Sequence, residues 1–297
     1  MKNPLHLVHP GSSKNVFQFV DVPAHLVFEF TDKVSIFDVG AFTTLFTGLG
    51  AIRCAIAIRC FEHLRSCGVD THFVGQFAHN QIIVLGVSIP EKKLTIATSN
   101  KQLLPVEILW RKEATKKLVN RVESGSLEIN RLKLSSGTKL LAGLKFDPLF
   151  VECSTKWEPA DRYLSDEEAV LIMSLRTGDL QRLYGFTRDV ANHLATLFEG
   201  KFTLQTGKFE IAIDQRGMFT LCDSITPDEL ELGGFDKNPL RKWYSENHPV
   251  WIEQLNKAKK LFPLDKSQWP TYPCDPPKPL IKLMVDNYSK VADAIGC

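Results

Sequence analysis

Lys208, Glu210 and Asp223, a lysine and two carboxylates, lie in a stretch whose residue pattern predicts a β-hairpin. From residue 208 to residue 213, large apolar side chains alternate with charged or small ones, which is the period of two of a half-buried strand. Residues 218–223 form a second β-prone run, and the Asp-Gln-Arg-Gly sequence between the runs is typical of a turn. The three charged side chains are therefore expected in one hairpin.

The register of this hairpin decides whether the three charges can act together. If Ile213 faces Met218 across the turn, Lys208 lies opposite Asp223, and Glu210 shares their face. Two carboxylates and a cation on one face can hold Mg²⁺ and the phosphates of ATP. A shift of one residue would turn Asp223 to the other face. The pattern alone favours a simpler alternative, a solvated polar face with a surface ion pair.

Strands are predicted mainly in the first third of the chain. A helix with one apolar stripe, at residues 51–67, interrupts them. The segment 112–145 is rich in Lys, Arg, Ser and Gly, and we interpret it as a short helix followed by a mobile hairpin or loop. The predicted strands cover residues 16–21, 26–32, 71–77, 81–87 and 104–110.

Helices are predicted mainly in the second half. Ser165 and Glu168 form a capping box that opens a helix to about residue 175. Apolar residues then step by threes and fours over residues 180–197, and a last helix covers residues 280–295. Strands at the front and helices at the back predict an α+β fold with a cleft between lobes.

The composition excludes several functional classes. The net charge of +2 over 297 residues leaves no broad basic field, so no nucleic-acid partner is expected. No apolar run reaches the ~20 residues needed to cross a bilayer, and no targeting signal is visible. Seven cysteines without C-x-x-C spacing favour free thiols in a cytoplasmic protein. Eight histidines show no H-E-x-x-H spacing, and His72 is expected to be a buried, hydrogen-bonded residue.

Several short strings follow one another along the chain. Residues 30–38 read F-T-D-K-V-S-I-F-D, residues 105–111 read P-V-E-I-L-W-R, and residues 208–210 read K-F-E. With G-L-G-A at 48–51 and T-P-D at 226–228, they resemble in sequence and order the motifs of the SAICAR synthetase family. That family is an ATP-dependent ligase of purine synthesis, which joins aspartate to a carboxyaminoimidazole ribonucleotide.

The resemblance implies a fold and a division of the chain. The expected fold is α+β, with two lobes and an ATP-binding cleft between antiparallel sheets. Residues 1–107 are expected to form an N-terminal β-rich lobe that covers ATP. Residues 108–297 are expected to form a C-terminal α+β lobe that carries the Mg²⁺–ATP hairpin and the acceptor site.

The resemblance also assigns roles on the nucleotide side. It implies that Lys14, Lys208, Glu210 and Asp223 bind ATP, and that Glu210 and Asp223 are the Mg²⁺ ligands. Lys208 and Lys156 are expected to be catalytic. In the reaction of the family, the γ-phosphoryl group of ATP passes to the acceptor carboxylate, and an amine attacks the resulting acyl phosphate.

The expected partners are two small molecules, a carboxylate and an amino acid. Assembly into a homo-oligomer is compatible with the sequence. Lys116 and Lys117 are either a substitute for a missing family arginine or a solvated loop. The residues that the resemblance assigns to substrate binding are Glu107, Arg111, Lys117, Lys237 and Arg241.

The chain departs from the family mainly on the acceptor side. The family's phosphate-binding Gly-Ser pair is replaced by Lys116 and Lys117, and its arginine after T-P-D is Glu231. Family lysines are replaced by Ser12 and Leu49, while most of the nucleotide-side residues are retained. A change from arginine to glutamate reverses the charge where a phosphate would sit.

These departures favour a ligase that joins an amino acid, with aspartate expected, to a different azole carboxylate in purine-like or nucleoside natural-product biosynthesis. Two alternatives stay open. One is an authentic SAICAR synthetase in which Lys117 or Arg121 takes over phosphate binding. The other is a non-catalytic ATP-binding paralogue, which the retention of Glu210 and Asp223 disfavours.

Overall fold

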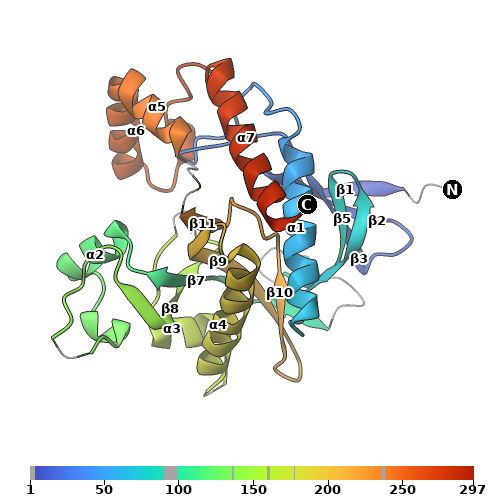
Figure 1. Ribbon diagram of the computed structural model, residues 1–297, viewed down its shortest axis with the longest axis vertical. Helices are drawn as coiled ribbons and strands as arrows, with labels where there is room; N and C mark the ends of the chain where they lie inside the picture. Colours follow the sequence, from blue (N-terminus) through green and yellow to red (C-terminus); the bar gives the residue numbers. More distant parts are fainter. Residues whose placement is uncertain are drawn as a thin grey trace.

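Two antiparallel sheets form the centre of the molecule (Figure 1). The computed structural model describes residues 4–89, 100–135, 137–158, 161–176, 178–233, 235 and 238–297. The first sheet has the strand order β1-β2-β3-β5-β4. Its strands are β1 (Leu5–His9), β2 (Lys14–Phe19), β3 (His25–Phe30), β4 (Phe73–Ala78) and β5 (Gln81–Leu85).

The second sheet is built around one long strand, β9 (Thr203–Asp214). The strand order is β10-β9-β7-β8, and β6 and β11 also pair with β9. The other strands are β6 (Lys101–Leu103), β7 (Val106–Glu113), β8 (Lys145–Thr155), β10 (Phe219–Cys222) and β11 (Leu230–Gly233).

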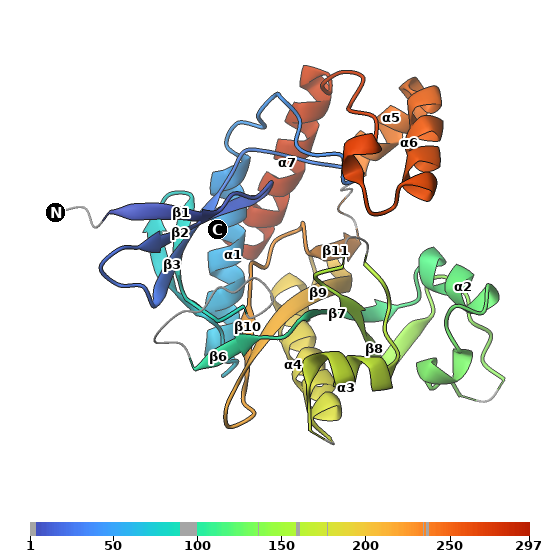
Figure 2. The same ribbon diagram turned by 180° about the vertical axis from the view of Figure 1, so that it is seen from behind.

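Helices cover both sheets and join them. In both views α1 (Leu49–Ser66) and α7 (Lys278–Ile295) lie side by side next to the first sheet (Figures 1 and 2). α3 (Asp166–Met173) and α4 (Asp179–Phe198) pack on the second sheet, and α1 also contacts α4. The remaining helices are α2 (Lys116–Glu123), η2 (Ile129–Leu132), α5 (Pro239–Asn247), α6 (Pro249–Leu261) and η3 (Lys266–Gln268).

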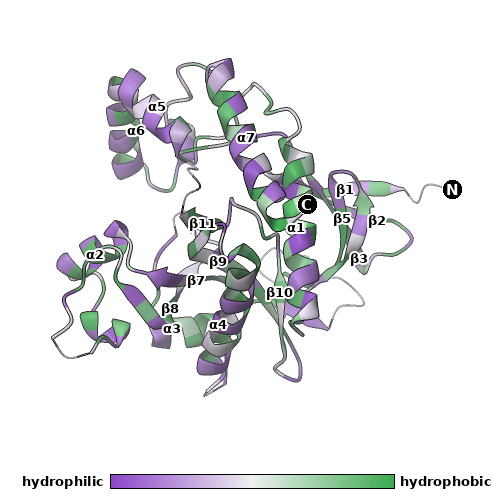
Figure 3. Cartoon of the chain, in the orientation of Figure 1, coloured by the Kyte–Doolittle hydropathy of each residue, from purple (hydrophilic) through white to green (hydrophobic). Residues whose placement is uncertain are grey.

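One hydrophobic core runs through both sheets. It includes Phe28 on β3, Phe61 on α1, Leu194 on α4 and Ile211 on β9, all of which are buried. Figure 3 shows the hydrophobic character of the strands at the centre of the first sheet, in contrast to the many hydrophilic residues of α5 and α6. No helix in the described ranges is long and apolar enough to cross a membrane.

The α+β class with antiparallel sheets is confirmed, and so are the predicted helices. The capping box of α3 is formed as expected: Ser165 Oγ accepts from the Glu168 amide at 3.1 Å, and Glu168 Oε2 accepts from the Ser165 amide at 2.9 Å. Strands β1, β6, β8 and β11 and helices α5 and α6 were not predicted. β8 begins where the loop-like composition of residues 112–145 ends, and its buried half lacks the alternation that marks a half-buried strand.

The predicted register of the hairpin is wrong by one residue. Ile213 pairs with Phe219, not with Met218, and Glu210 therefore pairs with Cys222. The length of the turn explains the difference. The Asp214 amide donates to the Met218 carbonyl at 3.1 Å, so Asp214 belongs to the paired strand and not to the turn. Gly217 has φ of 78°, which only a residue without Cβ adopts readily, and this closes a three-residue loop.

Candidate functional site

The corrected register alone would turn Asp223 away from Glu210. Asp223 follows the last residue of β10, however, and its backbone has φ of 64°, in the left-handed region. Aspartate enters this region more readily than most residues, and there the chain leaves the alternation of the strand. The result is that the Asp223 carboxylate forms an ion pair with Lys14, and it lies close enough to Glu210 to change that residue's pKa.

Four side chains form what we call the junction cluster, because it lies where the two sheets meet: Lys14, Lys156, Glu210 and Asp223. Lys14 is the first residue of β2 and pairs with Asp223, while Lys156 follows β8 and pairs with Glu210. Lys14 Nζ also donates to Ser224 Oγ at 3.1 Å. The four side chains are between 11% and 20% exposed, so they are shielded from bulk water but within reach of a ligand.

Burial and mutual charge shift the pKa values within this cluster. Burial raises the pKa of Glu210, the Asp223 carboxylate raises it further, and Lys156 partly opposes both. Burial also acts to raise the pKa of Asp223, but Lys14 and then Lys156 outweigh it and hold that pKa below its ordinary value. The two carboxylates therefore repel each other across a short gap, which is the environment that a divalent cation stabilises.

The donor set fits Mg²⁺ held jointly with phosphates. No group of three His, Cys, Asp or Glu side chains suited to a metal exists in the parts of the chain that the structure describes. Magnesium does not need such a cage, because it keeps several waters and is usually bound by one or two carboxylates together with substrate phosphates. Glu210 and Asp223 supply those two carboxylates, and Lys14 and Lys156 supply cations beside them.

His72 holds the backbone of Asp223 in place. Its side chain is 3% exposed, and its Nε2 lies 2.8 Å from the Asp223 carbonyl oxygen. Burial lowers the pKa of His72 to about 4, so the ring is neutral and donates through Nε2–H. The expectation of a buried, hydrogen-bonded histidine is confirmed, and the bond fixes the left-handed residue that aims the carboxylate.

Lys208 lies on the same face of β9 as Glu210 but does not face Asp223. Its Nζ donates to Glu107 Oε1 at 3.0 Å, across the pairing of β9 with β7. Burial lowers the pKa of Lys208, but Glu107 and more distant carboxylates outweigh it and raise that pKa above its ordinary value. Burial and Glu107 raise the pKa of Asp161, while Lys208 opposes them, so Glu107, Lys208 and Asp161 lie in one neighbourhood.

Arg111 belongs to a second group of charges, which we call the buried guanidinium group: Arg111, Arg121 and Glu152. Arg121 donates to the two Glu152 oxygens at 2.8 and 3.0 Å, and Arg111 donates to Oε1 as well. Glu152 has no exposed surface. Arg121 also stacks on the Tyr163 ring at 3.3 Å from its centroid, with the Lys117 ammonium 5.4 Å from the same centroid.

A pocket of about 630 Å³ opens beside this group. Lys117, Arg121, Asp161 and Tyr163 line it, and so does Leu264. The structure thus places Lys117 at a pocket, whereas Arg111 is held behind it by Glu152. Arg241 lies on α5, where it donates to Asn238 Oδ1 at 2.9 Å and stacks over Phe37 at 5.8 Å. The predicted substrate residue Lys237 lies outside the described residues.

Known proteins share this fold and these sequence features. A family model described as SAICAR synthetase matches residues 7–258. The chain belongs to the SAICAR synthetase family.

Individual relatives are distant. A phosphoribosylaminoimidazole-succinocarboxamide synthase from Nautilia profundicola is 28% identical over 268 residues, which cover 86% of this chain and 100% of that one. Among solved structures, a SAICAR synthase from Saccharomyces cerevisiae complexed with SAICAR has a TM-score of 0.72 at 18% identity, covering 98% and 94% of the two chains. A type-2 SAICAR synthetase in complex with ADP has a TM-score of 0.61 at 18% identity, covering 91% and 100%.

Behind the junction cluster of this family member lies a buttress that the sequence did not reveal. Arg53 Nε donates to Asp228 Oδ2 at 2.8 Å, and the Tyr288 hydroxyl donates to Asp228 Oδ1 at 2.6 Å. Next to them Thr226 Oγ1 donates to Glu229 at 2.7 Å. The sequence signals were the T-P-D string and Tyr288, which also matches the family's last helix, whereas nothing singled out Arg53 on α1.

The close packing of α1 against this region depends on the second glycine of the family's G-x-G-A string. A Cβ on Gly50 would lie 2.5 Å from the Phe30 carbonyl oxygen, which no real Cβ contact allows. The Gly50 amide donates to Asp32 Oδ1 at 2.7 Å, so the F-T-D string caps the start of α1. This string therefore acts through main-chain geometry in the structure.

Glu231, the departure with reversed charge, lies on β11 of the second sheet. It pairs with Thr206 on β9, and Thr206 pairs with Arg111 on β7. Directly paired residues of antiparallel strands share a face, so Glu231 and Arg111 face the same side, two strands or roughly 10 Å apart. The charge reversal therefore falls next to the buried guanidinium group.

Proposed function

We propose that this chain is an ATP-dependent ligase that joins aspartate to the carboxylate of carboxyaminoimidazole ribonucleotide, the reaction of its family. The observation that carries the proposal is the junction cluster, in which two lysines and two carboxylates converge from four strands or strand ends of both sheets. The relatives named for this synthase and the neighbours solved with SAICAR and with ADP support it.

The cluster suits phosphoryl transfer because each of its charges has a partner that phosphate or Mg²⁺ can replace. Lys14 and Lys156 would release Asp223 and Glu210 and turn to the phosphates of ATP, and the carboxylates would hold Mg²⁺. Bound Mg²⁺ supplies charge neutralisation for the transferring phosphoryl group. The residues themselves act by positioning and by electrostatics, which are the main contributions in phosphoryl transfer.

The chemistry proceeds in two steps. An oxygen of the acceptor carboxylate attacks the γ-phosphorus of ATP, ADP leaves, and an acyl phosphate forms. The amine nitrogen then attacks the acyl carbon, loses its proton, and displaces inorganic phosphate. We assign Lys208, with Lys156, to catalysis, because Glu107 holds the Lys208 ammonium on the face of β9 that also carries Glu210.

We assign Glu107, Arg111, Lys117, Lys237 and Arg241 to the acceptor and the amino acid. Glu107 would act through Lys208, and Arg111 through Glu152, which also holds the pocket-lining Arg121. We propose that residues 1–107 form the lobe that covers ATP and residues 108–297 the lobe with the acceptor site. All seven cysteines are free thiols, which supports a reducing cytoplasmic setting.

A second candidate is a paralogue that uses the same chemistry on another azole carboxylate, as in nucleoside natural-product biosynthesis. The observation in its favour is Glu231, which faces the same side of the sheet as Arg111. A phosphate beside an unneutralised carboxylate is repelled by ~1 to 4 kcal/mol, depending on the effective dielectric.

One assay tests the function and separates the candidates. ADP release is measured with Mg²⁺–ATP and aspartate over azole carboxylates that are free, ribosylated or phosphoribosylated. We expect the phosphoribosylated carboxyaminoimidazole to give the highest kcat/KM. Preference for an acceptor without phosphate supports the paralogue instead, and the absence of ADP release with every acceptor contradicts both.

Glu231 provides the matched variant. If the paralogue reading holds, the double substitution Glu231→Arg and Leu230→Ser, which restores the family pattern, raises turnover of the phosphoribosylated acceptor. If the chain is itself a SAICAR synthetase, the wild type already turns over the phosphoribosylated acceptor efficiently, and the double substitution adds little.

A further inference from the structure

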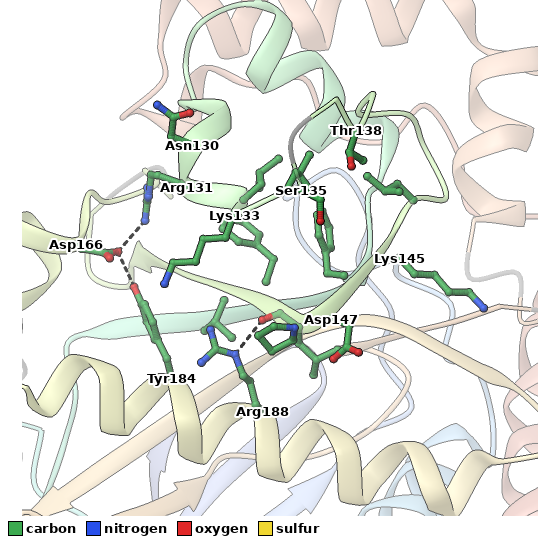
Figure 4. Close-up of a pocket in the computed structure, with 18 of the residues that line it drawn as sticks. Asn130, Arg131, Lys133, Ser135, Thr138, Lys145, Asp147, Asp166, Tyr184 and Arg188 are labelled. Atoms are coloured by element: carbon green, nitrogen blue, oxygen red, sulfur yellow. Dashed lines mark hydrogen bonds and ion pairs between the residues drawn. The ribbon is translucent and has the colours of Figure 1, made fainter.

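A second polar pocket lies apart from the junction cluster, on the other side of the C-terminal part of the fold. Its volume is about 540 Å³, within the range of sites that bind small molecules. η2 and the residues after it form one wall, the first half of β8 forms the floor, and α4 closes the side (Figure 4). None of the residues that we assign to ATP or to the acceptor lines it.

The lining combines an apolar floor with an excess of positive charge. Leu132, Phe146, Phe150 and Val151 are buried hydrophobic residues of this floor and wall. Four cationic and two acidic side chains line the pocket. One pair is already neutral, since Arg131 donates to Asp166 at 2.8 Å.

Two of the remaining cations converge on one end. Figure 4 shows the Lys133 side chain directed toward Tyr184 and Arg188, with Lys145 and Asp147 at the opposite side of the pocket. Arg188 is held by its Nε, which donates to the Leu149 carbonyl at 2.9 Å, so the two terminal nitrogens of its guanidinium remain for a ligand. Among the described residues that line the pocket, the acid at this end is Asp166, which is used by Arg131 and by the Tyr184 hydroxyl at 2.9 Å.

The backbone conformation of Lys133 also bears on the pocket. Lys133 has φ of 50° in the left-handed region, where a non-glycine residue is uncommon and strained. Lys133 is the C-cap of η2, and its left-handed turn ends that helix at the edge of the pocket that Lys133 lines. Two cations that face each other across a cavity also repel, unless an anion lies between them.

We propose that this pocket binds a small metabolite with an anionic head, a phosphate or a carboxylate, and a compact apolar or aromatic body. Lys133 and Arg188 hold the head, and a guanidinium with two free nitrogens suits the two oxygens of either group. The body lies on Phe150 and the neighbouring apolar residues of β8. The site is independent of the proposed ligase reaction and of its substrates.

The test uses isothermal titration calorimetry on the full chain with four probes: phenyl phosphate, benzoate, inorganic phosphate and benzyl alcohol. We expect phenyl phosphate or benzoate to bind at one site with a submillimolar Kd, and the tighter of the two identifies the head group. Inorganic phosphate and benzyl alcohol should bind at least tenfold more weakly, because each lacks half of the recognised structure. Equal binding of benzyl alcohol, or no binding of either aromatic anion, would overturn the proposal.

Variants locate the site. Lys133→Met removes the positive charge but keeps an unbranched side chain of similar length at this exposed residue, and it should weaken binding at least tenfold. Arg188→Met should weaken binding to the same extent. Lys139→Met is the matched control, since Lys139 is an exposed lysine of the same segment that does not line the pocket, and it should leave Kd unchanged. If Arg188→Met fails to fold, Lys133→Met still decides. Unchanged affinity in Lys133→Met contradicts the site.

Saturating ADP with Mg²⁺ separates this site from the proposed ATP site. We expect the Kd of the aromatic anion to stay within twofold in its presence, and also in Lys14→Met. Competition by ADP–Mg²⁺ would show that the anion occupies the nucleotide site and would refute a separate pocket. Failure of ATP binding itself would count only against the proposed function.

Discussion

The junction cluster and the buried guanidinium group are both built from charges of opposite sign, yet they differ in burial and in the geometry of their bonds. In the junction cluster each carboxylate has one lysine, and the side chains keep 11% to 20% of their surface exposed. In the guanidinium group a single carboxylate with no exposed surface accepts from two arginines. Lysine is a flexible point charge, whereas arginine offers a rigid fork that matches a carboxylate.

This difference separates charges that can change partners from charges that hold the fold. A lysine–carboxylate pair that keeps 11% to 20% of its surface exposed lies within reach of solvent and ligand, so ligand phosphates and Mg²⁺ can replace its bonds. A buried carboxylate cannot lose its arginines without leaving uncompensated charge in the interior. We therefore expect substitutions in the first region to act on catalysis and substitutions in the second to act on folding and on the acceptor pocket.

The largest effect is expected from Glu152→Gln. Removing this carboxylate leaves two buried guanidinium groups without a counter-charge, and breaking a buried pair in this way costs ~3 to 5 kcal/mol of unfolding free energy. Urea unfolding followed by circular dichroism measures the loss. The exposed Glu253→Gln on α6 is the control and should stay within ~0.5 kcal/mol of wild type. If Glu152→Gln is as stable as wild type, the buried guanidinium group does not hold the fold, and the proposed difference from the junction cluster is wrong.

Glu210→Gln and Asp223→Asn should give the opposite result. Each removes a proposed Mg²⁺ ligand, and losing an electrostatic contribution of this kind lowers kcat by ~10²- to 10³-fold. The melting temperature should change little, because each substitution also relieves the repulsion between the two carboxylates, which offsets the loss of one pair with a lysine. Turnover and melting curves are recorded on the same preparations. Normal turnover by folded variants would remove the metal assignment and leave the hairpin a structural role.

His72→Phe tests whether the left-handed Asp223 depends on its hydrogen bond. The neighbouring rings of Phe28 and Phe61 lie 5.5 and 5.9 Å away, so a phenyl ring fits the aromatic setting but cannot donate. One buried neutral hydrogen bond contributes ~1 kcal/mol, which corresponds to about a fivefold weaker Mg²⁺-dependent ATP affinity. His72→Gln keeps an N–H donor and should recover part of the lost ATP affinity. Equal Mg²⁺ dependence in both variants would mean that the bond does not position Asp223.

The smallest effect is a pH dependence from Glu229. Burial, and then the charge of Asp228, raise the pKa of Glu229 to about 7. Because the folded-state pKa lies above that of the unfolded chain, its contribution to stability is complete below the unfolded pKa, near 4.3. That contribution is lost as the pH rises to about 7, with a slope of at most ~1.4 kcal/mol per pH unit for one proton.

Glu229→Gln should remove that component and flatten the unfolding free energy between about pH 4.5 and 7. The measurement is urea unfolding at half-unit pH steps for wild type and variant. An identical slope in the two proteins would show that Glu229 is ionised in the folded state across this range.

Local signals determined much of the secondary structure. The capping box at Ser165 and Glu168 starts α3 in the structure as it does in the sequence, and the leucine spacing over residues 180–197 corresponds to α4. The alternation around Glu210 produced β9, with Phe209 and Ile211 buried as that pattern requires. Each of these features depends on neighbours within a few residues, which is why sequence reasoning finds them.

The site itself was only partly visible in the sequence. Motif resemblance pointed to Lys14, Lys156, Glu210 and Asp223, and the structure brings these four together. Lys208 was expected opposite Asp223, but the hairpin register differs by one residue, and the Lys208 ammonium pairs with Glu107 on the neighbouring strand β7. A turn of three residues instead of four is enough to make that change, and sequence patterns do not distinguish the two lengths.

What tertiary structure alone decided is how distant charges meet. Glu152 lies 41 residues from Arg111 and 31 from Arg121, and they meet in one buried group through the pairing of β7 with β8 and the packing of α2 on β8. The direction of the Asp223 side chain depends on a left-handed backbone and on His72, which is 151 residues away. Local periodicity and motif order were sufficient to predict α1, α3, α4 and α7, the central strands and the family. The working geometry of the charges rests on long-range packing, which no local pattern encodes.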